Sequence, residues 1–367
     1  MIRLAVIGLG AVTRNIHLPA YRRLKGRVTL VAGCDVDLAT RAAMEKTGLF
    51  KRIYDSHEEM LDKAKPDVVS ICTPPFLHHQ QCLDALERDC HVFCEKPLAE
   101  SLAHADEIIL ASSRCMRSVV VNSQFPNMNI YTAAKKQIGS PEFGRLLFLH
   151  AWQTFRPTAD TEGGWRANMQ RRLCFEFGVH VFELIRHFFD ATPSTLWAHM
   201  PRPIRASNTE SLNIIAMEFP DGRAASILLD RVSKGPERYL EMRLDGEHAA
   251  VHTSIGGELR FEVGLHTRQR KPFMGLHVVK GGQAVLQQAE RATVIGTDGM
   301  NPFASATAVH FGNFLSAIED GRVPSGTAED HKATLALTLA AYDAAESRKV
   351  VAIAPYLSGA ATRKDLS

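Results

Sequence analysis

Residues 4–13 read Leu-Ala-Val-Ile-Gly-Leu-Gly-Ala-Val-Thr, and this stretch decides the predicted fold. Its first four residues are all apolar, which is typical of a parallel strand buried on both faces. Gly8 permits a tight turn, and Gly10 lets a phosphate approach the backbone. The next two residues begin a helix whose free N–H groups face the phosphate charge, namely Ala11 and Val12. Although Thr13 replaces the usual third glycine, the stretch predicts a dinucleotide-binding turn.

A carboxylate at the end of the next strand supports this prediction. Residues 28–34 read as a buried strand, and Asp35 follows it, 25 residues after Gly10. A carboxylate at this place binds the 2′-hydroxyl of the adenosine ribose. Val36 and Asp37 come next and no arginine follows at once, so NAD is favoured over NADP. The alternative is that Asp35 only caps a helix at 38–47.

Three further strands, at 67–73, 91–94 and 119–121, alternate with helices such as 77–88. Such alternation predicts a doubly wound parallel sheet, whose ligands bind at the carboxyl ends of the strands. We expect cofactor-binding residues at that edge, and the candidates besides the glycine turn and Asp35 are Thr73, Pro74, His78, Glu95 and Lys96. His78 either lies near the cofactor or is an exposed residue at a helix N-terminus. The sequence therefore predicts a Rossmann domain over residues 1–122.

The composition of the chain limits its function class. A length of 367 residues predicts two domains, and a net charge of +3 gives no general field for nucleic acid or anionic membranes. We find no apolar run as long as a membrane span and no signal peptide at the N-terminus. The seven cysteines form no Cys-x-x-Cys pair, so we expect free core thiols in a reducing cytoplasm.

The second predicted domain, residues 123–367, mixes strands and helices. Strands are expected at 146–152, 212–219 and 224–230, and Pro220-Asp221-Gly222 is typical of a hairpin turn between the last two. Amphipathic helices are expected at 303–319 and 328–346, and a loose tail over the last dozen residues.

The chain resembles the glucose–fructose oxidoreductase, inositol dehydrogenase and rhizopine-catabolism (Gfo/Idh/MocA) family of oxidoreductases. The stretches that carry the resemblance are Gly8-Leu9-Gly10, Thr73-Pro74-Pro75 with His78, Cys94 to Ala99 (Cys-Glu-Lys-Pro-Leu-Ala), Trp165-Arg166, Gly178-Val179-His180, and the closing stretches 311–315 and 341–345. The resemblance implies a C-terminal α+β domain built on a large, mostly antiparallel sheet. One face of that sheet would cover a substrate, and the other would form the interface of a dimer or tetramer.

Oxidation of a secondary alcohol needs a hydride acceptor, a base and a positive group beside the developing alkoxide. We expect NAD to be the acceptor, His180 the base and Lys96 the positive group, and the resemblance implies the same two roles. It also implies a cis proline after Lys96, and closure of Trp165 and Arg166 over the nicotinamide.

The sequence departs from the family before His180. The family has aspartate four residues earlier, and Glu176 stands there on a predicted helix at 173–189. We expect Glu176 to join the catalytic group with an altered substrate geometry. A glycine run is also replaced by Gln170 to Cys174, in which Arg171 and Arg172 are expected in an exposed loop, with a substrate carboxylate as the alternative partner.

The helix also carries Glu176, His180, Glu183 and His187 at metal-ligand spacing, but such faces are common without metal, and no metal site is predicted.

The leading hypothesis is an NAD-dependent dehydrogenase of a sugar, cyclitol or related polyol. Two alternatives stay open. One is a glycoside-cleaving enzyme that retains NAD and oxidises its substrate transiently, which the altered Glu176 region motivates. The other is a dinucleotide-dependent regulator without catalysis.

Overall fold

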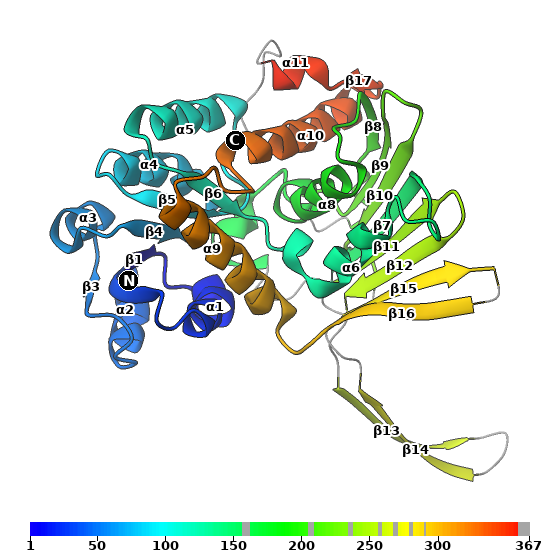
Figure 1. Cartoon of the computed structure of the whole chain (residues 1–367), viewed down its shortest axis with the longest axis horizontal. Coiled ribbons are helices and arrows are strands. Elements are labelled where there is room, and N and C mark those ends of the chain that lie inside the picture. The colour runs from blue at the N-terminus through cyan, green and yellow to red at the C-terminus, as the bar shows by residue number, and fades with distance from the viewer. Residues whose placement is uncertain are drawn as a thin grey trace.

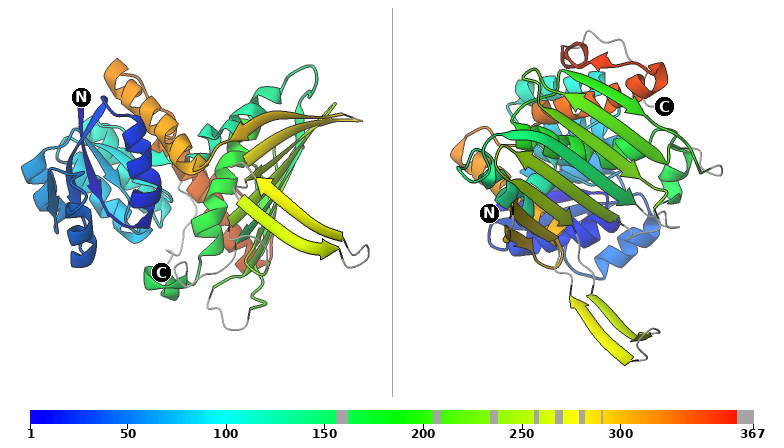
Figure 2. Two further views of the ribbon diagram at one scale, coloured as in Figure 1. Left: turned by 90° about the horizontal axis from the view of Figure 1, so that it is seen from below. Right: turned by 90° about the vertical axis from the view of Figure 1, so that its right-hand side faces the viewer.

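The computed structural model describes residues 1–155, 162–204, 209–233, 238–255, 259–266, 271–278, 282–289 and 291–358. It contains a six-stranded sheet and a nine-stranded sheet, each with its own helices, and a separate two-stranded hairpin (Figure 1). Helices lie between the two large sheets (Figure 2, left).

The six-stranded sheet is parallel throughout and has the order β3-β2-β1-β4-β5-β6. Its strands are β1 (Ile2–Ile7), β2 (Val28–Cys34), β3 (Arg52–Tyr54), β4 (Val68–Ile71), β5 (His91–Glu95) and β6 (Val119–Asn122). The helices of this domain are α1 (Leu18–Arg23), α2 (Leu38–Glu45), α3 (His57–Ala64), α4 (Pro75–Leu86) and α5 (Leu102–Cys115). The Rossmann prediction is confirmed. Helix α4 begins two residues earlier than expected, because a proline fits the first turn of a helix.

The nine-stranded sheet has the order β16-β15-β12-β11-β7-β10-β9-β8-β17. Its strands are β7 (Leu146–Phe155), β8 (Thr195–His199), β9 (Leu212–Glu218), β10 (Ala224–Asp230), β11 (Arg238–Gly246), β12 (Ala250–Ile255), β15 (Gly282–Gln288), β16 (Arg291–Asp298) and β17 (Val351–Ala352). Among these described strands only β7 and β10 run parallel as neighbours, so the expected mostly antiparallel sheet is confirmed. The predicted turn between β9 and β10 is also present, with Gly222 at φ +81°.

Three long helices fill the space between the sheets: α8 (Val179–Phe189), α9 (Pro302–Asp320) and α10 (Ala328–Ser347). Helix α9 returns to the Rossmann domain, where Phe311 packs on Phe93 of β5 with ring centroids 4.9 Å apart. Helix α10 begins with a capping box formed by Thr327 and Asp330. The C-terminal helices therefore join the two domains, although they follow the second sheet in sequence. The shorter helix α6 (Asn129–Gln137) packs against β15 and β16.

The C-terminal segment differs from the prediction, and the hairpin of residues 259–278 was not predicted. Residues Ala354–Leu357 form helix α11, and Tyr356 is buried there and donates to Asp343. The loose-tail prediction is therefore wrong up to this point, because an aromatic anchor holds the segment, and residues 359–367 lie outside the described part. Strands β13 (Leu259–His266) and β14 (Lys271–Val278) form a hairpin that extends away from both large sheets (Figures 1 and 2).

All seven cysteines lie in the described part of the chain and are free, five of them buried, as expected. Within the same part, no helix combines the length and the apolar character needed to cross a bilayer.

Candidate active site

The glycine turn after β1 is built for a close approach of a phosphate. Gly8 has φ +86°, and a Cβ there would lie 2.8 Å from the carbonyl oxygen of Cys72, so a larger residue does not fit. A Cβ on Gly10 would meet no atom within 4 Å, which leaves the open space that a pyrophosphate needs. Thr13, the departure from the fingerprint, is buried and its hydroxyl donates to the carbonyl of Gly8. The residues present therefore fit a dinucleotide, with Ala11 and Val12 at the start of the helix.

Asp35 lies at the end of β2 and holds this turn. Its Oδ2 accepts the N–H of Leu9 at 2.8 Å, and its Oδ1 accepts the N–H of Asp37. Helix α2 is capped by Asp37, whose side chain accepts the N–H of Thr40. The alternative that Asp35 only caps the helix is therefore wrong.

An arginine that sequence reasoning missed lies on the same turn. Arg41, six residues after Asp35, donates from Nη1 to the carbonyls of Asp35 and Val36 at 2.8 and 2.9 Å. A cation therefore lies beside Asp35 although none directly follows it in the sequence, and this weakens the preference for NAD over NADP. The place of Arg41 in the first turns of helix α2, which begins directly after Asp37, was the signal that could have shown it.

The loops after β4 and β5 are joined by His78. This residue is fully buried, so the exposed alternative is wrong. Its Nδ1 lies 2.8 Å from the carbonyl oxygen of Pro97, and its Nε2 lies 2.9 Å from that of Thr73. Burial lowers the pKa of His78 and outweighs these carbonyls. With both ring nitrogens facing protein carbonyls, His78 connects Thr73 to the turn at Pro97.

Lys96 extends from that turn to the second domain. The Lys96–Pro97 peptide is cis, as the resemblance implied. The Nζ of Lys96 donates to the carbonyl of Glu176 at 2.8 Å. Thus a side chain from the edge of the Rossmann sheet contacts the backbone turn that precedes His180.

Glu95 is held by a series of buried side-chain hydrogen bonds that sequence reasoning missed. His17 and Asn122 both lie 2.7 Å from its Oε1. The other nitrogen of His17 contacts Tyr21, which donates to Ser70. Burial opposes charge on both partners, yet His17, Lys96 and Asn122 lower the pKa of Glu95. Likewise Cys72, Tyr21 and Glu95 outweigh burial and raise the pKa of His17 well above 6.5, so the pair is ionic.

The predicted helix at 173–189 is present but begins irregularly. Residues Leu173–Gly178 form a π-helical turn, and α8 follows from Val179. Such turns insert an extra residue and are frequent at functional sites. His180 in the first turn of α8 is buried, and its ring stacks on Phe125 with centroids 4.2 Å apart and planes 3° apart. The stacking fixes the imidazole one turn beyond the carbonyl that Lys96 contacts.

Glu176 belongs to a group of five charged residues, here called the arginine–glutamate cluster: Glu162, Arg166, Arg172, Glu176 and Arg231. Its two carboxylate oxygens each accept an arginine Nε at 2.7 Å, one from Arg166 and one from Arg172. Nη1 of Arg172 contacts Glu162 at 3.1 Å, and Glu162 also contacts Arg231. Burial favours a neutral carboxyl, but Arg166, Lys96 and Arg172 outweigh it and lower the pKa of Glu176.

The prediction of an exposed loop is wrong for Arg172, which is only 1% exposed. Its backbone N–H and that of Cys174 donate to the buried carboxylate of Glu210, which also accepts the hydroxyl of Tyr342. Arg171 instead lies over the ring of Tyr342 and pairs with Glu346 near the surface. Sequence reasoning missed Glu210 and Arg231, because both come from distant segments.

Trp165 and Arg166 lie beside helix α4 of the Rossmann domain. The guanidinium of Arg166 stacks over the ring of Trp165 at 4.2 Å, and Phe76 of α4 packs edge-on against that ring, with centroids 6.3 Å apart. Phe76 was not predicted, although it directly follows Thr73-Pro74-Pro75. The segment thus bridges the Rossmann domain and Glu176.

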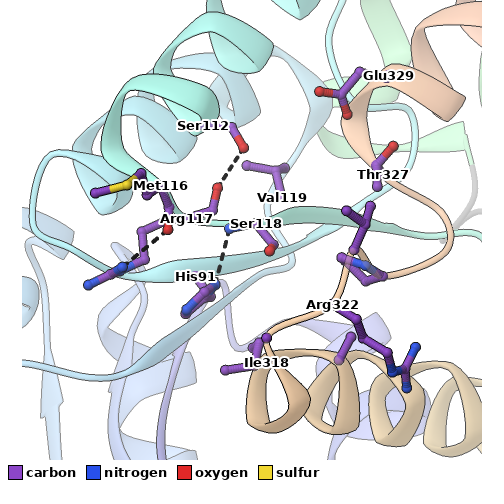
Figure 3. A pocket seen from close by; sticks show the side chains of 14 residues that line it. His91, Ser112, Met116, Arg117, Ser118, Val119, Ile318, Arg322, Thr327 and Glu329 are labelled. Carbon is purple, nitrogen blue, oxygen red and sulfur yellow. Dashed lines mark hydrogen bonds between the residues drawn. The ribbon is translucent and has the colours of Figure 1, made fainter.

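Two other features lie apart from this group of residues. Glu183 accepts a hydrogen bond from the hydroxyl of Thr334 and lies near Arg186. In the described part of the chain, three side chains that could hold a metal ion meet at a different place, namely His57, Glu58 and Asp84. A cavity of about 350 Å³ opens at the amino ends of β5 and β6, beside His91, Arg117 and Arg322 (Figure 3). It faces the sheet edge opposite to Lys96.

Comparisons with known proteins agree with this arrangement. A model of the oxidoreductase family with an NAD-binding Rossmann fold matches residues 2–123, and the Gfo/Idh/MocA C-terminal domain matches residues 131–252. The chain is 24% identical to 1,5-anhydro-D-fructose reductase of Ensifer adhaerens over 96% of this chain and 99% of that protein.

Other relatives match over shorter stretches. D-glucoside 3-dehydrogenase of Escherichia coli is 38% identical over 29% of this chain and 30% of its own length. Inositol 2-dehydrogenase of an Arthrobacter species is 33% identical over 51% of this chain and 54% of its own. The chain thus spans about a third to half of these two relatives.

Among solved structures, an oxidoreductase from Agrobacterium radiobacter in complex with NAD+, L-tartaric acid and magnesium shares the fold. Its TM-score is 0.78 at 18% identity, and the match covers 96% of this chain and 98% of that one. The fold, the glycine turn, the Lys96–Pro97 turn and the two family matches lead to one assignment. The chain belongs to the Gfo/Idh/MocA family of oxidoreductases.

Proposed function

We propose that the protein is an NAD-dependent dehydrogenase that oxidises a secondary alcohol of a sugar, cyclitol or related polyol. One observation carries the proposal. Nζ of Lys96, from the cofactor edge, lies 2.8 Å from the carbonyl oxygen of Glu176, one turn before His180. This contact brings the candidate positive group and the candidate base to one place between the domains.

The chemistry assigns separate tasks to these residues. When bound, the nicotinamide accepts the hydride. His180 takes the proton of the substrate hydroxyl, and its stacking on Phe125 keeps the imidazole oriented for this. Lys96 orients the hydroxyl and stabilises the negative charge that develops on its oxygen. Glu176 is ionised and engaged by two arginines, so its role in our proposal is to position the Lys96 contact and the substrate rather than to transfer a proton.

The cofactor preference is part of the proposal. Asp35 favours NAD, because its carboxylate suits a ribose hydroxyl and repels a phosphate. Arg41 opposes this preference, but its Nη1 already donates to two backbone carbonyls. Names of relatives such as inositol 2-dehydrogenase support a polyhydroxylated substrate.

We also propose a homo-oligomer that forms through the nine-stranded sheet. The face turned away from the helices exposes large apolar residues on β7, β8 and β9, namely Phe148, Trp152, Trp197 and Ile214. Such a patch is typical of an interface. The seven free cysteines support a cytoplasmic location.

The test is a panel of sugars, cyclitols, aldonates and glycosides with NAD+ or NADP+, followed at the absorbance of the reduced cofactor. We expect NADH to accumulate with at least one compound. With that compound, Lys96→Met and His180→Asn should each lower kcat by about 100-fold or more. Lys63→Met, at an exposed surface pair, serves as the matched control and should leave kcat unchanged.

Other outcomes would identify another function. Release of an aglycone without net NADH would indicate the redox-neutral glycoside-cleaving alternative. Tight cofactor binding with no turnover across the panel would indicate the regulator. If both variants kept full turnover, the assigned roles would be wrong.

A further inference from the structure

Arg231, directly after β10, is a buried cation with unused hydrogen-bond donors. It is 3% exposed, and its backbone N–H donates to the carbonyl of Ser211 at 2.9 Å. Nη2 contacts Glu162, but Nε and Nη1 have no hydrogen-bond partner among the described residues. A guanidinium stays charged at any physiological pH, and a buried donor without an acceptor is costly. Nε and Nη1 of Arg231 therefore have no acceptor among the described residues, and a bound ligand with acceptor oxygens would satisfy them.

Neighbouring strands add more polar groups of the same kind. Asn213 of β9 and Gln153 of β7 both pair in register with Leu229 of β10, two residues before Arg231. Residues opposite one another share a face, and residues two apart in a strand do as well, so all of these lie on the covered face of the sheet. Both amide atoms of Asn213, Oε1 of Gln153 and Oγ of Ser211 are buried and have no hydrogen-bond partner within the described ranges. We call Ser211, Asn213, Gln153 and Arg231 the polar wall.

The polar wall adjoins the candidate active site. A Cβ on Gly178 would lie 2.9 Å from Cδ1 of Leu229, so the π-helical turn with Glu176 packs directly over this row of the sheet. Figure 2 shows the helices that continue from this turn lying between the sheet and the Rossmann domain. A continuous series of contacts also runs from Lys96 through Glu176, Arg172 and Glu162 to Arg231.

Arg231 shares its counter-ion in the described part of the chain. Glu162 contacts both Arg231 and Arg172, and both arginines are buried. Glu210, which lies beneath Arg172, is already engaged by two backbone N–H groups and two hydroxyls. A buried cation that shares one carboxylate is stabilised by a further anionic acceptor.

We propose that the substrate is an anionic polyol, a hydroxylated compound with a carboxylate group such as an aldonate or uronate. This inference rests on the proposed function and names its substrate class. The carboxylate accepts hydrogen bonds from Nε and Nη1 of Arg231, in the charge-assisted pairing that a guanidinium favours. The amides of Asn213 and Gln153 donate and accept, as the hydroxyls of the chain require. A neutral polyol would satisfy the amides but would offer Nε and Nη1 of Arg231 no charged acceptor.

The first experiment compares acids with neutral parents of the same carbon number, for example gluconate with glucitol and glucuronate with glucose. We measure kcat/KM with NAD+, and by calorimetry the affinity of the enzyme–NADH complex for each compound. We expect the acid of at least one pair to show a kcat/KM and an affinity at least tenfold above those of its parent. Arg231→Met should reduce this acid-to-neutral ratio by at least tenfold, and Arg231→Lys should restore part of it.

Two further variants make the result specific. Asn213→Asp adds a carboxylate to the polar wall at almost constant volume, so it should lower the acid-to-neutral ratio even if Arg231→Met fails to fold. Arg223→Met removes a partly buried arginine in the β9–β10 turn, paired with Asp221, and should leave the ratio unchanged.

The possible failures are distinguishable. If neutral polyols are oxidised as well as their acids or better, the anionic-substrate inference is wrong and the proposed function stands. If no compound is oxidised, the proposed function is wrong, and calorimetry then decides the inference alone. Acid binding that is lost in Arg231→Met supports it, while equal or absent binding in both proteins overturns it and indicates that ordered water satisfies the polar wall.

Discussion

Two buried glutamates, one in each domain, hold the two halves of the site in different ways. Glu95 of the Rossmann domain pairs with His17 and Asn122, whereas Glu176 of the second domain pairs with Arg166 and Arg172. Both carboxyls have a lowered pKa despite burial. Both also flank Lys96, because Glu95 precedes it in the chain and the carbonyl of Glu176 accepts its Nζ.

The difference lies in what the partner does when the carboxylate is removed. An imidazole can release its proton and remain buried as a neutral ring. A guanidinium cannot, because its pKa is above 12. The same change from glutamate to glutamine therefore leaves a neutral pair in one domain, whereas in the other the guanidinium groups stay charged and lose one carboxylate partner.

The largest effect is expected for Glu176→Gln. This change leaves Arg172, 1% exposed, with Glu162 as its remaining described counter-ion, and it removes the counter-ion of Arg166. Breaking a buried ion pair by removing one partner costs about 3–5 kcal/mol. Urea unfolding followed by circular dichroism measures the free energy of unfolding. Glu346→Gln breaks the surface pair with Arg171 and should change stability by less than about 0.5 kcal/mol. Equal losses for the two variants would contradict the distinction.

The contrast between these regions also explains what the sequence could predict. The order of Gly8, Asp35, Thr73 and Lys96 along one sheet edge follows from local patterns, since each residue ends a buried strand and parallel strands end together. The cis peptide between Lys96 and Pro97 was implied by the family resemblance and not by these local patterns.

The arginine–glutamate cluster could not be found from such patterns. Arg231 meets Glu162 across 69 residues, and Arg172 meets Glu210 across 38. A basic dipeptide such as Arg171-Arg172 usually predicts solvent exposure, and only tertiary packing separates the surface residue from the buried one. The π-helical turns at Thr13–His17 and Leu173–Gly178 shift His17 and Glu176 relative to a regular helix, which a period of 3.6 residues does not anticipate.

A smaller effect is expected for Glu95→Gln. The glutamine still accepts from His17, which becomes neutral, so the loss should be about 1.5–3 kcal/mol, the range for a hydrogen bond to a charged group. Glu107→Gln is the matched control, because Glu107 pairs with His79 at 2.8 Å on the surface. It should cost no more than a few tenths of a kcal/mol. Denaturation of the two variants beside the wild type tests the order Glu176→Gln, Glu95→Gln, Glu107→Gln, and any other order would break the comparison.

The smallest expected effect is a change in how the free energy of unfolding depends on pH. It tests the property that distinguishes His17 from an arginine, namely that His17 can lose its proton. The folded pKa of His17 is raised well above 6.5, so its contribution to stability is complete below pH 6.5 and is lost as the pH rises towards that folded value. The pKa of Glu95 is lowered from 4.5, so its contribution is lost only at more acidic pH, outside this window. Between pH 6.5 and 8, the wild type should therefore lose stability relative to His17→Gln by up to about 1.4 kcal/mol per pH unit.

Histidines whose pKa is lowered by burial, such as His78 and His310, are present in both proteins and cancel in the difference. Unfolding free energies of the two proteins in matched buffers give this difference, and parallel curves would mean that His17 is neutral and that Glu95 is held by hydrogen bonds alone.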